Sequence, residues 1–316
     1  MWTSGFRLYF CNQFQCCQKD FVKQYGQWAV ITGATDGIGQ SMAKEFARCG
    51  NSILVIGRNE TKLAATKAML EAEPNVGAVE TVKIDLSDSS LENFASIREQ
   101  IDPDNRDIGI LINNAGTFPG KFIRYNRNEM ESLLEVANLN MIAPMHMTRM
   151  IMPGMVSRGK GLILNVSSIA GEATLPYMSV YAATKTFLNA FTRQLQAEYA
   201  SHPLDIVLLT PGPVRTKLYK ATTRTHKTFV NPAPDDYARS AINALAARPK
   251  EYSGTFVHEL MVEGIKMGNC FGIIRFLFEA SLSLHARHYE LSPVPKRKNL
   301  GGDHSESPST SDSGDI

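Results

Sequence analysis

Residues 28–39 of the chain, WAVITGATDGIG, determine how the rest of the sequence is interpreted. The apolar run at the start of this stretch is continuous rather than alternating, which predicts a strand buried on both faces, and the residues from Ile38 onward predict a helix. The loop between them contains three glycines, Gly33, Gly37 and Gly39. Glycines there permit a tight turn and let backbone N–H groups approach a diphosphate at the positive end of the helix dipole. A tight strand-to-helix connection without a ligand would have the same sequence pattern, so the downstream sequence has to decide between a dinucleotide site and a simple connection.

The composition limits the classes of protein to which the chain can belong. Its 316 residues, 43% hydrophobic and 20% charged, suffice for the core of one large domain with extensions. A net charge of +2 gives no reason to expect a nucleic-acid partner. The five cysteines are an odd number without metal-site spacing, which favours a reduced compartment and predicts no metal site.

Apolar segments alternate with helical segments along the chain. After the first strand, further strands are expected at 52–57, 80–84, 108–112 and 161–166. Helices are expected at 61–72, 89–100, 128–152 and 179–199. This alternation predicts an α/β fold of the Rossmann type, a doubly wound parallel sheet with right-handed crossovers. Ligands of such sheets bind at the carboxyl ends of the strands, and four candidates lie there: Gly33, Arg58, Asp85 and Asn113.

Arg58, at the end of the second strand, bears on the choice of dinucleotide. In this kind of fold the residue roughly 20 positions past the glycine loop meets the adenosine ribose, where a carboxylate binds the free 2′-OH and a cation accommodates a 2′-phosphate. Gly57 and Arg58 stand at that position, which favours NADPH/NADP+, whereas Asp36 in the loop argues mildly for the opposite. A surface arginine at a strand end is the alternative. Asp85 is expected either to hydrogen-bond the adenine amino group or to cap the following helix.

Tyr181 and Lys185 lie four residues apart on the predicted helix 179–199 and therefore share one face. A phenol has a pKa near ~10, and a nearby cation favours the phenolate and lowers that pKa. Such a pair often arises by chance and is weak evidence for an active site on its own. The evidence becomes stronger with Ser168, which lies thirteen residues before Tyr181 at the tip of the preceding strand. The serine hydroxyl there can donate a hydrogen bond to a substrate carbonyl.

Asn140 lies in the interior of the predicted helix 128–152. Asparagine is a poor choice for a helix interior, and Pro144 removes a backbone hydrogen bond four residues later, so a kink is expected near Asn140. Such a kink would free a carbonyl for water. With the glycine loop, the Asn-Asn-Ala-Gly sequence at 113–116, Ser168, the Tyr–Lys pair and the Pro-Gly pair at 211–212, these residues form an ordered set whose chance assembly is negligible.

The motifs TGATDGIG, NNAG, YAATK and PGPVRT, with Asn140 and Ser168, resemble those of the short-chain dehydrogenase/reductase family over about residues 28–259. More narrowly, YGQWAVITGATDGIG, GILINNAG, MPGMVSRGKGLILNVSS and VYAATKTFLNAFT resemble the group of 17β-hydroxysteroid dehydrogenases types 3 and 12. Type 12 members of that group act as very-long-chain 3-oxoacyl-CoA reductases.

The resemblance implies a role for each matching residue. Tyr181 would pass its proton to a carbonyl oxygen that Ser168 holds. Lys185 would lower the pKa of Tyr181 and hold the nicotinamide ribose, and Asn140 would anchor a relay water. Val214 and Thr216 would contact the carboxamide end of the cofactor.

The predicted catalytic residues are Asn140, Ser168, Tyr181 and Lys185. The predicted residues for NADPH/NADP+ binding are Gly33, Thr35, Asp36, Gly37, Ile38, Gly39, Arg58, Asp85, Asn113, Ala115, Gly116, Tyr181, Lys185, Pro211, Gly212, Val214 and Thr216.

The hypothesis that follows is an NADPH-dependent reductase of a carbonyl on a lipid substrate, either a 3-oxoacyl-CoA or a 17-ketosteroid. The region where this family places its substrate lid carries five cations and no acid: Arg215, Lys217, Lys220, Arg224 and Lys227. These cations would suit the phosphates of an acyl-CoA, although a solvated loop explains them equally well. The alternative function is a non-catalytic dinucleotide-binding or scaffold protein on the same fold, which would require a spoiled active site.

The ends of the chain are expected to extend a single catalytic domain. The expected division is an N-terminal lead at 1–27, the catalytic domain at 28–260, an amphipathic helical extension at 261–292 and a disordered tail at 293–316. The extension is either an interfacial helix on a membrane or a core or dimer helix.

The subgroup resemblance implies a location at the cytosolic face of the endoplasmic reticulum membrane. No N-terminal apolar run approaches the ~20 residues of a spanning helix, so peripheral contact is expected, through the helical extension or through lipidation of Cys16 and Cys17. Idle thiols are the alternative for the two cysteines. A homodimer is a further hypothesis.

Overall fold

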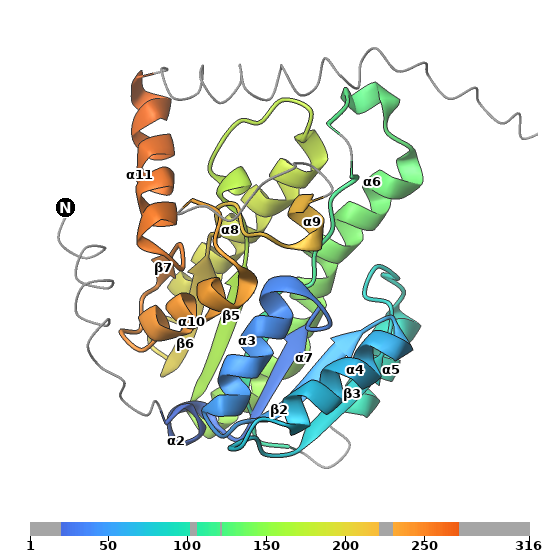
Figure 1. Ribbon diagram of the computed structural model, residues 1–316, viewed down its shortest axis with the longest axis vertical. Helices are drawn as coiled ribbons and strands as arrows, with labels where there is room; N and C mark the ends of the chain where they lie inside the picture. The colour runs from blue at the N-terminus through green and yellow to red at the C-terminus, as the bar shows by residue number, and fades with distance from the viewer. Residues whose placement is uncertain (1–19, 102–105, 121, 221–229, 272–316) are drawn as a thin grey trace, which may run out of the picture.

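The computed structural model describes residues 20–101, 106–120, 122–220 and 230–271. They form a seven-stranded parallel sheet in the order β3-β2-β1-β4-β5-β6-β7 (Figure 1). The strands are β1 (Trp28–Thr32), β2 (Ser52–Gly57), β3 (Val79–Lys83), β4 (Ile108–Asn113), β5 (Gly161–Val166), β6 (Leu204–Leu209) and β7 (Glu251–Tyr252). The order reverses between β1 and β4, as it does in a doubly wound sheet, so the predicted fold class is confirmed.

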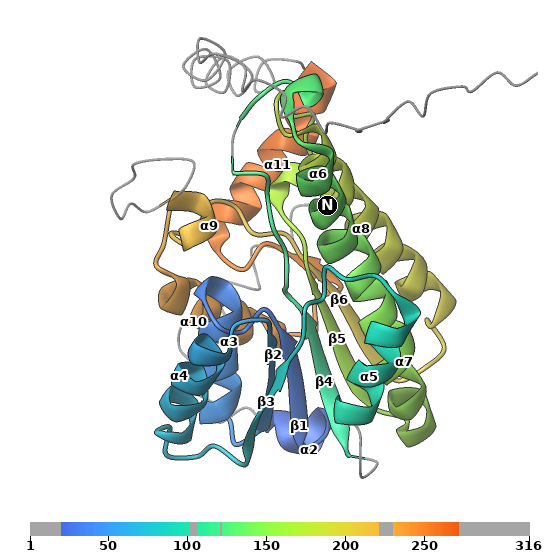
Figure 2. The same cartoon turned by 90° about the vertical axis from the view of Figure 1, so that its right-hand side faces the viewer.

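Helices cover both faces of the sheet (Figure 2). The apolar cores on the two faces show that α3 (Gly37–Arg48), α4 (Glu60–Glu71) and α10 (Pro234–Leu245) cover one face. The other face is covered by α5 (Leu91–Ile101), α7 (Ala143–Arg158) and α8 (Ser179–Glu198). The remaining helical segments are α2 (Phe21–Tyr25), η1 (Tyr125–Arg127), α6 (Met130–Ala137), η2 (Asn138–Ile142), η3 (Ile169–Gly171), α9 (Lys217–Lys220) and α11 (Phe256–Phe271).

The first strand shows why the apolar runs are continuous. Ala29 and Ile31 pack into the core on the α3 side, whereas Val30 packs into the core on the α7 side. Successive side chains of a strand point to opposite faces, so a strand covered on both sides needs apolar residues at every position. All three side chains are fully buried, as the run predicted.

The expected long helix at 128–152 is interrupted. Helix α6 ends at Ala137, a π-helical turn follows at Asn138–Ile142, and α7 begins at Ala143. The irregularity expected near Asn140 is therefore present, but as a π-helical turn. Pro144 lies in the first turn of α7, directly after the π-helical turn, and lacks the N–H that would continue the hydrogen-bond pattern of the helix.

The two ends of the described chain pack on the domain. Helix α2, which falls in the expected lead, buries Phe21 and Tyr25 against the core. Helix α11 covers the first part of the expected helical extension, and residues 272–316 lie outside the described residues. Within the described parts of the chain, every helix is too short or too polar to cross a membrane.

Candidate active site

The glycine loop between β1 and α3 is shaped by two residues with positive φ. Gly33 has φ of 65° and Gly37 has φ of 56°, a region that side chains disfavour. A Cβ on Gly33 would lie 2.8 Å from Cα of Ala115, and a Cβ on Gly37 would lie 3.0 Å from Cγ2 of Thr216. Asp36 extends the turn by accepting a 2.9 Å hydrogen bond from the N–H of Gly37. Glycine is therefore required here by both conformation and close approach.

Asn114 fixes this loop to the end of β4. Its Nδ2 donates to the carbonyl oxygens of Thr32 (3.0 Å) and Gly33 (3.2 Å). Thr32 Oγ1 in turn accepts hydrogen bonds from the N–H groups of Asn114 and Ala115, both at 3.0 Å. A Cβ on Gly39 would clash with the Asn114 amide, which explains the third glycine. Neither Asn114 nor Thr32 was among the predicted site residues, although both belong to the motifs that pointed to the site.

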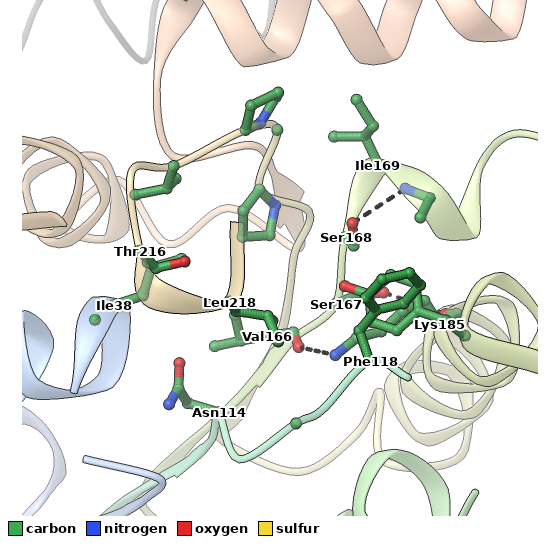
Figure 3. Close-up of a pocket in the computed structure, with 18 of the residues that line it drawn as sticks. Ile38, Asn114, Phe118, Val166, Ser167, Ser168, Ile169, Lys185, Thr216 and Leu218 are labelled. Atoms are coloured by element: carbon green, nitrogen blue, oxygen red, sulfur yellow. Dashed lines mark hydrogen bonds between the residues drawn. The ribbon is translucent and has the colours of Figure 1, made fainter. Parts of the chain in front are cut away.

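Tyr181, Lys185 and Ser168 converge where β5 and α8 meet (Figure 3). The side chains of Ser168 and Tyr181 interact, and Oγ of Ser168 accepts the N–H of Ala170 at 3.1 Å. Lys185 Nζ lies 5.9 Å from the centre of the Tyr181 ring and donates to the carbonyl oxygen of Val166 at 3.1 Å. The structure therefore brings the predicted serine, tyrosine and lysine to one place.

Burial sets the direction of the pKa shifts of Tyr181 and Lys185. It raises the pKa of Tyr181 above its ordinary value, and the interaction with Ser168 offsets only part of that rise. Burial also lowers the pKa of Lys185 to about 8. Desolvation of the phenolate therefore dominates the pKa of Tyr181 in the protein alone, and the expected lowering of that pKa by Lys185 stays a prediction. At neutral pH Tyr181 carries its proton and Lys185 remains mostly charged.

Asn140 lies in the π-helical turn, 1% exposed, behind this group. Its Oδ1 accepts the N–H of Thr117 at 2.9 Å, and its Nδ2 donates to the carbonyl oxygen of Thr117 (3.1 Å) and to Oγ1 of Thr184 (3.0 Å). A Cβ on Gly116 would lie 3.2 Å from Asn140 Oδ1 and 3.5 Å from Lys185 Nζ, so the amide and the ammonium flank one glycine. Asn140 thereby ties the chain after β4 to the helix that carries Lys185.

A cavity of about 510 Å³ joins the glycine loop to the tyrosine. Most of the predicted site residues line it: Gly33, Asp36, Gly37, Ile38, Ala115, Gly116, Ser168, Tyr181, Lys185, Pro211, Gly212, Val214 and Thr216. The others do not line it: Thr35, Gly39, Arg58, Asp85, Asn113 and Asn140. The side chain of Asn113 instead donates to Thr148 Oγ1 and Asn165 Oδ1 inside the fold.

Arg58 lies beside the cavity at the carboxyl edge of β2, with its side chain 60% exposed. Its Nη1 donates to Glu135 at 3.0 Å and to Asp85 at 3.5 Å. Asp36, which argued against a 2′-phosphate, is neutralised in the structure, because Lys217 Nζ lies 2.7 Å and Lys62 Nζ 3.7 Å from its carboxylate. Burial opposes ionisation of Asp36, yet the interactions with Lys217, the N–H of Gly37 and Lys62 together outweigh it and lower the pKa of Asp36.

The cavity has two unlike sides. One, which we call the glycine wall, consists of Gly33, Asp36, Gly37, Ile38 and Thr216. The other, the apolar wall, consists of Phe118, Phe122, Ile169, Leu175 and Met178. The Phe118 ring meets the ring of Tyr181 edge-on, with centroids 5.5 Å apart. Sequence reasoning missed the apolar wall, because its residues come from irregular segments without a periodic pattern.

The glycine wall fits a dinucleotide. Its two positive-φ glycines leave no Cβ between the loop backbone and the cavity, and α3 begins at that loop. A helix N-terminus with free N–H groups is the standard protein site for a diphosphate. The cavity then continues to the serine, the tyrosine and the lysine, so a ligand bound along it would reach from the loop to a proton donor.

Comparison with known proteins gives the same picture. Residues 27–227 match the family described as short chain dehydrogenase. The chain is 33% identical over 244 residues to a protein of Homo sapiens named very-long-chain 3-oxoacyl-CoA reductase, covering 75% of this chain and 73% of the relative. It is 34% identical over 242 residues to another protein of Homo sapiens, named inactive hydroxysteroid dehydrogenase-like protein 1, covering 76% and 72%.

Among solved structures, a short-chain dehydrogenase from Sphingobium yanoikuyae in complex with NADPH is similar. The two chains superpose with a TM-score of 0.66 at 27% sequence identity. The match covers 78% of this chain and 96% of the other. The described fold is therefore shared over nearly the whole length of that protein.

Proposed function

Because the chain belongs to the short chain dehydrogenase family, we propose that it is an NADP(H)-dependent oxidoreductase that reduces the carbonyl group of a lipid substrate. One observation carries the proposal: Ser168, Tyr181 and Lys185 line the same cavity as the glycine loop. That cavity brings a proton donor within reach of a ligand held at the loop. The similar structure that contains NADPH supports the choice of cofactor.

The residues of the glycine wall would hold the dinucleotide. The backbone from Gly33 to Gly39 and the N-terminus of α3 would bind the diphosphate. Arg58 would bind the 2′-phosphate. In doing so, it would exchange one or both of its present partners, the carboxylates of Glu135 and Asp85, for the phosphate. Val214 and Thr216 would contact the carboxamide end. When bound, the cofactor supplies the hydride that is transferred to the carbonyl carbon.

Tyr181 would give its proton to the carbonyl oxygen. Its raised pKa keeps the phenol protonated at neutral pH, which is the form that reduction needs. Ser168 would hold the same oxygen by a hydrogen bond that strengthens as negative charge develops there. The ammonium group of Lys185 would stabilise the resulting phenolate and replace its proton through water anchored near Asn140.

The apolar wall supports a lipid as substrate. Phe118, Leu175 and Met178 surround the tyrosine with hydrocarbon, which suits a fatty acyl chain or a steroid better than a sugar or an amino acid. Lys217 also lines the cavity, but its ammonium group is paired with Asp36. We favour a 3-oxoacyl-CoA over a 17-ketosteroid, because one relative of this chain is named very-long-chain 3-oxoacyl-CoA reductase. Of the five predicted cations, Arg224 and Lys227 lie outside the described residues.

The alternative is a non-catalytic protein that binds a dinucleotide on the same fold. The relative whose name includes the word inactive favours it. Against it, this chain has a serine, a tyrosine, a lysine and an asparagine at all four predicted catalytic positions. Three of these side chains, Ser168, Tyr181 and Lys185, line one cavity.

We further propose peripheral contact with the cytosolic face of the endoplasmic reticulum membrane. Leu260 and Met267 on α11 are about half exposed, and such side chains would suit an interfacial helix. A homodimer stays a prediction. Cell fractionation with a salt wash tests the contact. A peripheral protein should sediment with the membranes and be released by salt, whereas an integral protein would stay in the pellet and a soluble one would not sediment.

Oxidation of NADPH with a panel of 3-oxoacyl-CoAs and 17-ketosteroids tests the proposed reaction. We expect turnover with at least one class, and the Michaelis constant for an acyl-CoA should rise with salt while that for a steroid should not. NADPH binding without turnover of any ketone would favour the non-catalytic alternative. Turnover of steroids alone would contradict the preference for acyl-CoA.

A further inference from the structure

Residues 167–178 connect β5 to α8 and so separate Ser168 from Tyr181 along the chain. Ser168 stands at the start of this connection, and Tyr181 follows it in the first turn of α8. The distance between the two hydroxyl groups therefore depends on the path of the connection. A polar interaction between two side chains weakens steeply when the distance between their atoms increases or their alignment worsens.

Gly171 brings the connection directly onto α8. A Cβ at this position would lie 2.8 Å from the carbonyl carbon of Lys185 and 2.8 Å from Nδ2 of Asn189. Oγ1 of Thr186 donates to the carbonyl oxygen of Gly171 at 3.1 Å. From the strand side, Oγ of Ser167 donates to the carbonyl oxygen of Lys185 at 3.2 Å. The connection thus rests on the helix at the level of the lysine.

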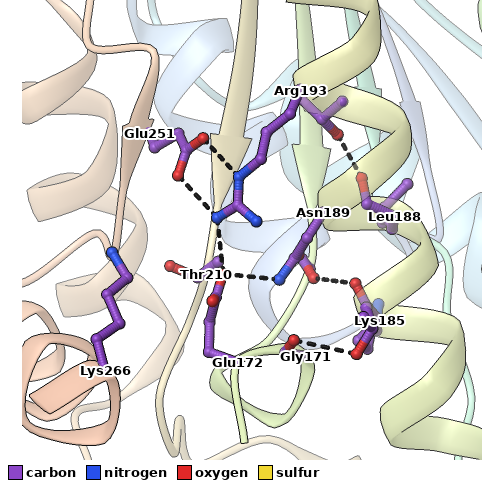
Figure 4. A network of polar contacts seen from close by, with 12 residues as sticks. Gly171, Glu172, Lys185, Leu188, Asn189, Arg193, Thr210, Glu251 and Lys266 are labelled. Atoms are coloured by element: carbon purple, nitrogen blue, oxygen red, sulfur yellow. Dashed lines mark hydrogen bonds and ion pairs between the residues drawn. The ribbon is translucent and has the colours of Figure 1, made fainter. Parts of the chain in front are cut away.

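Glu172 completes this attachment (Figure 4). Its Oε1 accepts hydrogen bonds from Nδ2 of Asn189 at 2.8 Å and from Nη2 of Arg193 at 2.9 Å. Arg193 also donates to both carboxylate oxygens of Glu251, at 2.8 and 3.0 Å, and thereby joins the group to β7. The Glu172 side chain is 13% exposed and Asn189 is 2% exposed, so the contact between them is largely shielded from water, whereas the Arg193 side chain is 40% exposed.

Two further features show that the connection is held firmly. Tyr177 has φ of 66°, a conformation that is unfavourable for a bulky residue and persists only where the surrounding structure enforces it. Ile169 packs against Val262 and Ile265 of α11. The connection is therefore fixed between α8 on one side and α11 on the other.

We propose that Glu172 is a positioning residue that keeps the hydroxyl group of Ser168 beside that of Tyr181 in the cavity, by tying the connection to Asn189 and Arg193 of α8. Glu172 does not itself line the cavity, so it acts on the site through the connection. The consequence for catalysis rests on the proposed function, whereas the effect on Tyr181 itself does not.

The sign of the effect follows from the interaction between the two side chains. The serine hydroxyl favours the phenolate and lowers the pKa of Tyr181. If Glu172 is removed and Ser168 moves away, the pKa of Tyr181 rises and a smaller fraction is phenolate at any given alkaline pH. A purely structural role would change stability without changing this fraction in the folded protein.

The test compares Glu172→Ala and Glu172→Gln with Asp205→Asn. Asp205 is a matched control, because it is 16% exposed and binds an arginine, Arg248, at the amino end of β6, whereas Glu172 follows the carboxyl end of β5. The ionisation of Tyr181 is followed by NMR of protein labelled at tyrosine Cζ, with Tyr181→Phe identifying the signal. Unfolding curves confirm that each variant is folded.

We expect the phenolate fraction of Tyr181 at alkaline pH to fall in Glu172→Ala and to stay unchanged in Asp205→Asn. Glu172→Gln keeps an acceptor for Asn189 and should show a smaller fall, which keeps the test valid if Glu172→Ala does not fold. With a ketone that the wild type reduces, kcat of Glu172→Ala should fall roughly 10- to 100-fold without a change in NADPH affinity. An unchanged Tyr181 ionisation in both folded Glu172 variants would overturn the proposal. Absence of turnover in the wild type would overturn only the proposed function.

Discussion

The glycine wall and the apolar wall face the same cavity but are built from different materials (Figure 3). The glycine wall presents backbone held by side-chain hydrogen bonds from behind, such as those of Asn114 to the carbonyl oxygens of Thr32 and Gly33. The apolar wall presents the side chains themselves, among them Phe118 and Met178. Backbone N–H groups would bind the diphosphate, which is common to all dinucleotides, and the glycines that expose them cannot be replaced without disturbing the fold. The side chains of the apolar wall can be replaced without such a disturbance.

This contrast predicts that substitutions in the glycine wall damage fold and cofactor binding together. Gly33→Ala should have the largest effect, because its Cβ would meet Cα of Ala115 at 2.8 Å and a backbone atom cannot easily move. We expect NADPH binding to be lost and the free energy of unfolding to fall by more than the ~1–2 kcal/mol that a left-handed residue costs.

Gly120→Ala is the control for that experiment. Gly120 has φ of 80°, and a Cβ at this position would have no other atom within 4 Å, so only the conformational cost applies. Calorimetry and fluorescence titration with NADPH should show a modest loss of stability and unchanged binding. Similar results for the two variants would show that close approach is unimportant in the glycine wall.

At the edge of the glycine wall, Arg58→Ala should weaken NADPH binding roughly 10- to 100-fold, the effect of losing charge-assisted hydrogen bonds to a phosphate. NADH lacks the 2′-phosphate, so its affinity should change little. Arg248→Ala removes a comparably exposed arginine far from the cavity and should affect neither cofactor. Equal losses for NADPH and NADH would remove the case for a 2′-phosphate site at Arg58.

Substitutions in the apolar wall should affect the substrate alone. Phe118→Ala removes a ring that contacts Tyr181, and we expect the Michaelis constant for the lipid ketone to rise roughly tenfold, the effect of losing part of one buried aromatic contact. NADPH affinity should not change. Phe187→Ala is the control, because Phe187 is also partly buried but does not line the cavity. A loss of NADPH affinity in Phe118→Ala would blur the distinction between the walls.

The smallest effect is expected at the contact between α9 and the glycine loop, Lys217 to Asp36. Lys217→Ala should lower the free energy of unfolding by no more than about 1 kcal/mol at pH 7, because the pair is partly exposed. The folded-state pKa of Asp36 is lowered, so this contribution is present above the ordinary pKa near ~4 and is lost as the pH falls through the folded value. Unfolding of both proteins across acidic pH measures it, and a difference that persists at the lowest pH would exclude the ion pair as its source.

The glycine wall could be predicted from the sequence, and the apolar wall could not. Gly33, Gly37 and Gly39 form a local pattern whose meaning depends on a strand before it and a helix after it, and both elements were visible as apolar runs. Phe118 and Met178 belong to irregular segments, and nothing local indicates which cavity they enter.

The pKa shifts of the site residues could not be predicted from the sequence either. The spacing of Tyr181 and Lys185 placed them on one face of a helix, but the direction of the Tyr181 pKa depends on burial by distant segments. The role of Glu172 likewise depends on partners 17 and 21 residues away, Asn189 and Arg193. Such contacts leave no periodic signal in a single sequence.

The central claim is that Tyr181 donates the proton that accompanies hydride transfer. Tyr181→Phe keeps the ring and its contact with Phe118 and removes only the hydroxyl group. With a ketone that the wild type reduces, we predict that the rate of NADPH oxidation falls roughly 10²- to 10⁴-fold, the range for loss of a general acid, while NADPH affinity is unchanged. Turnover by Tyr181→Phe close to the wild-type rate would contradict the account.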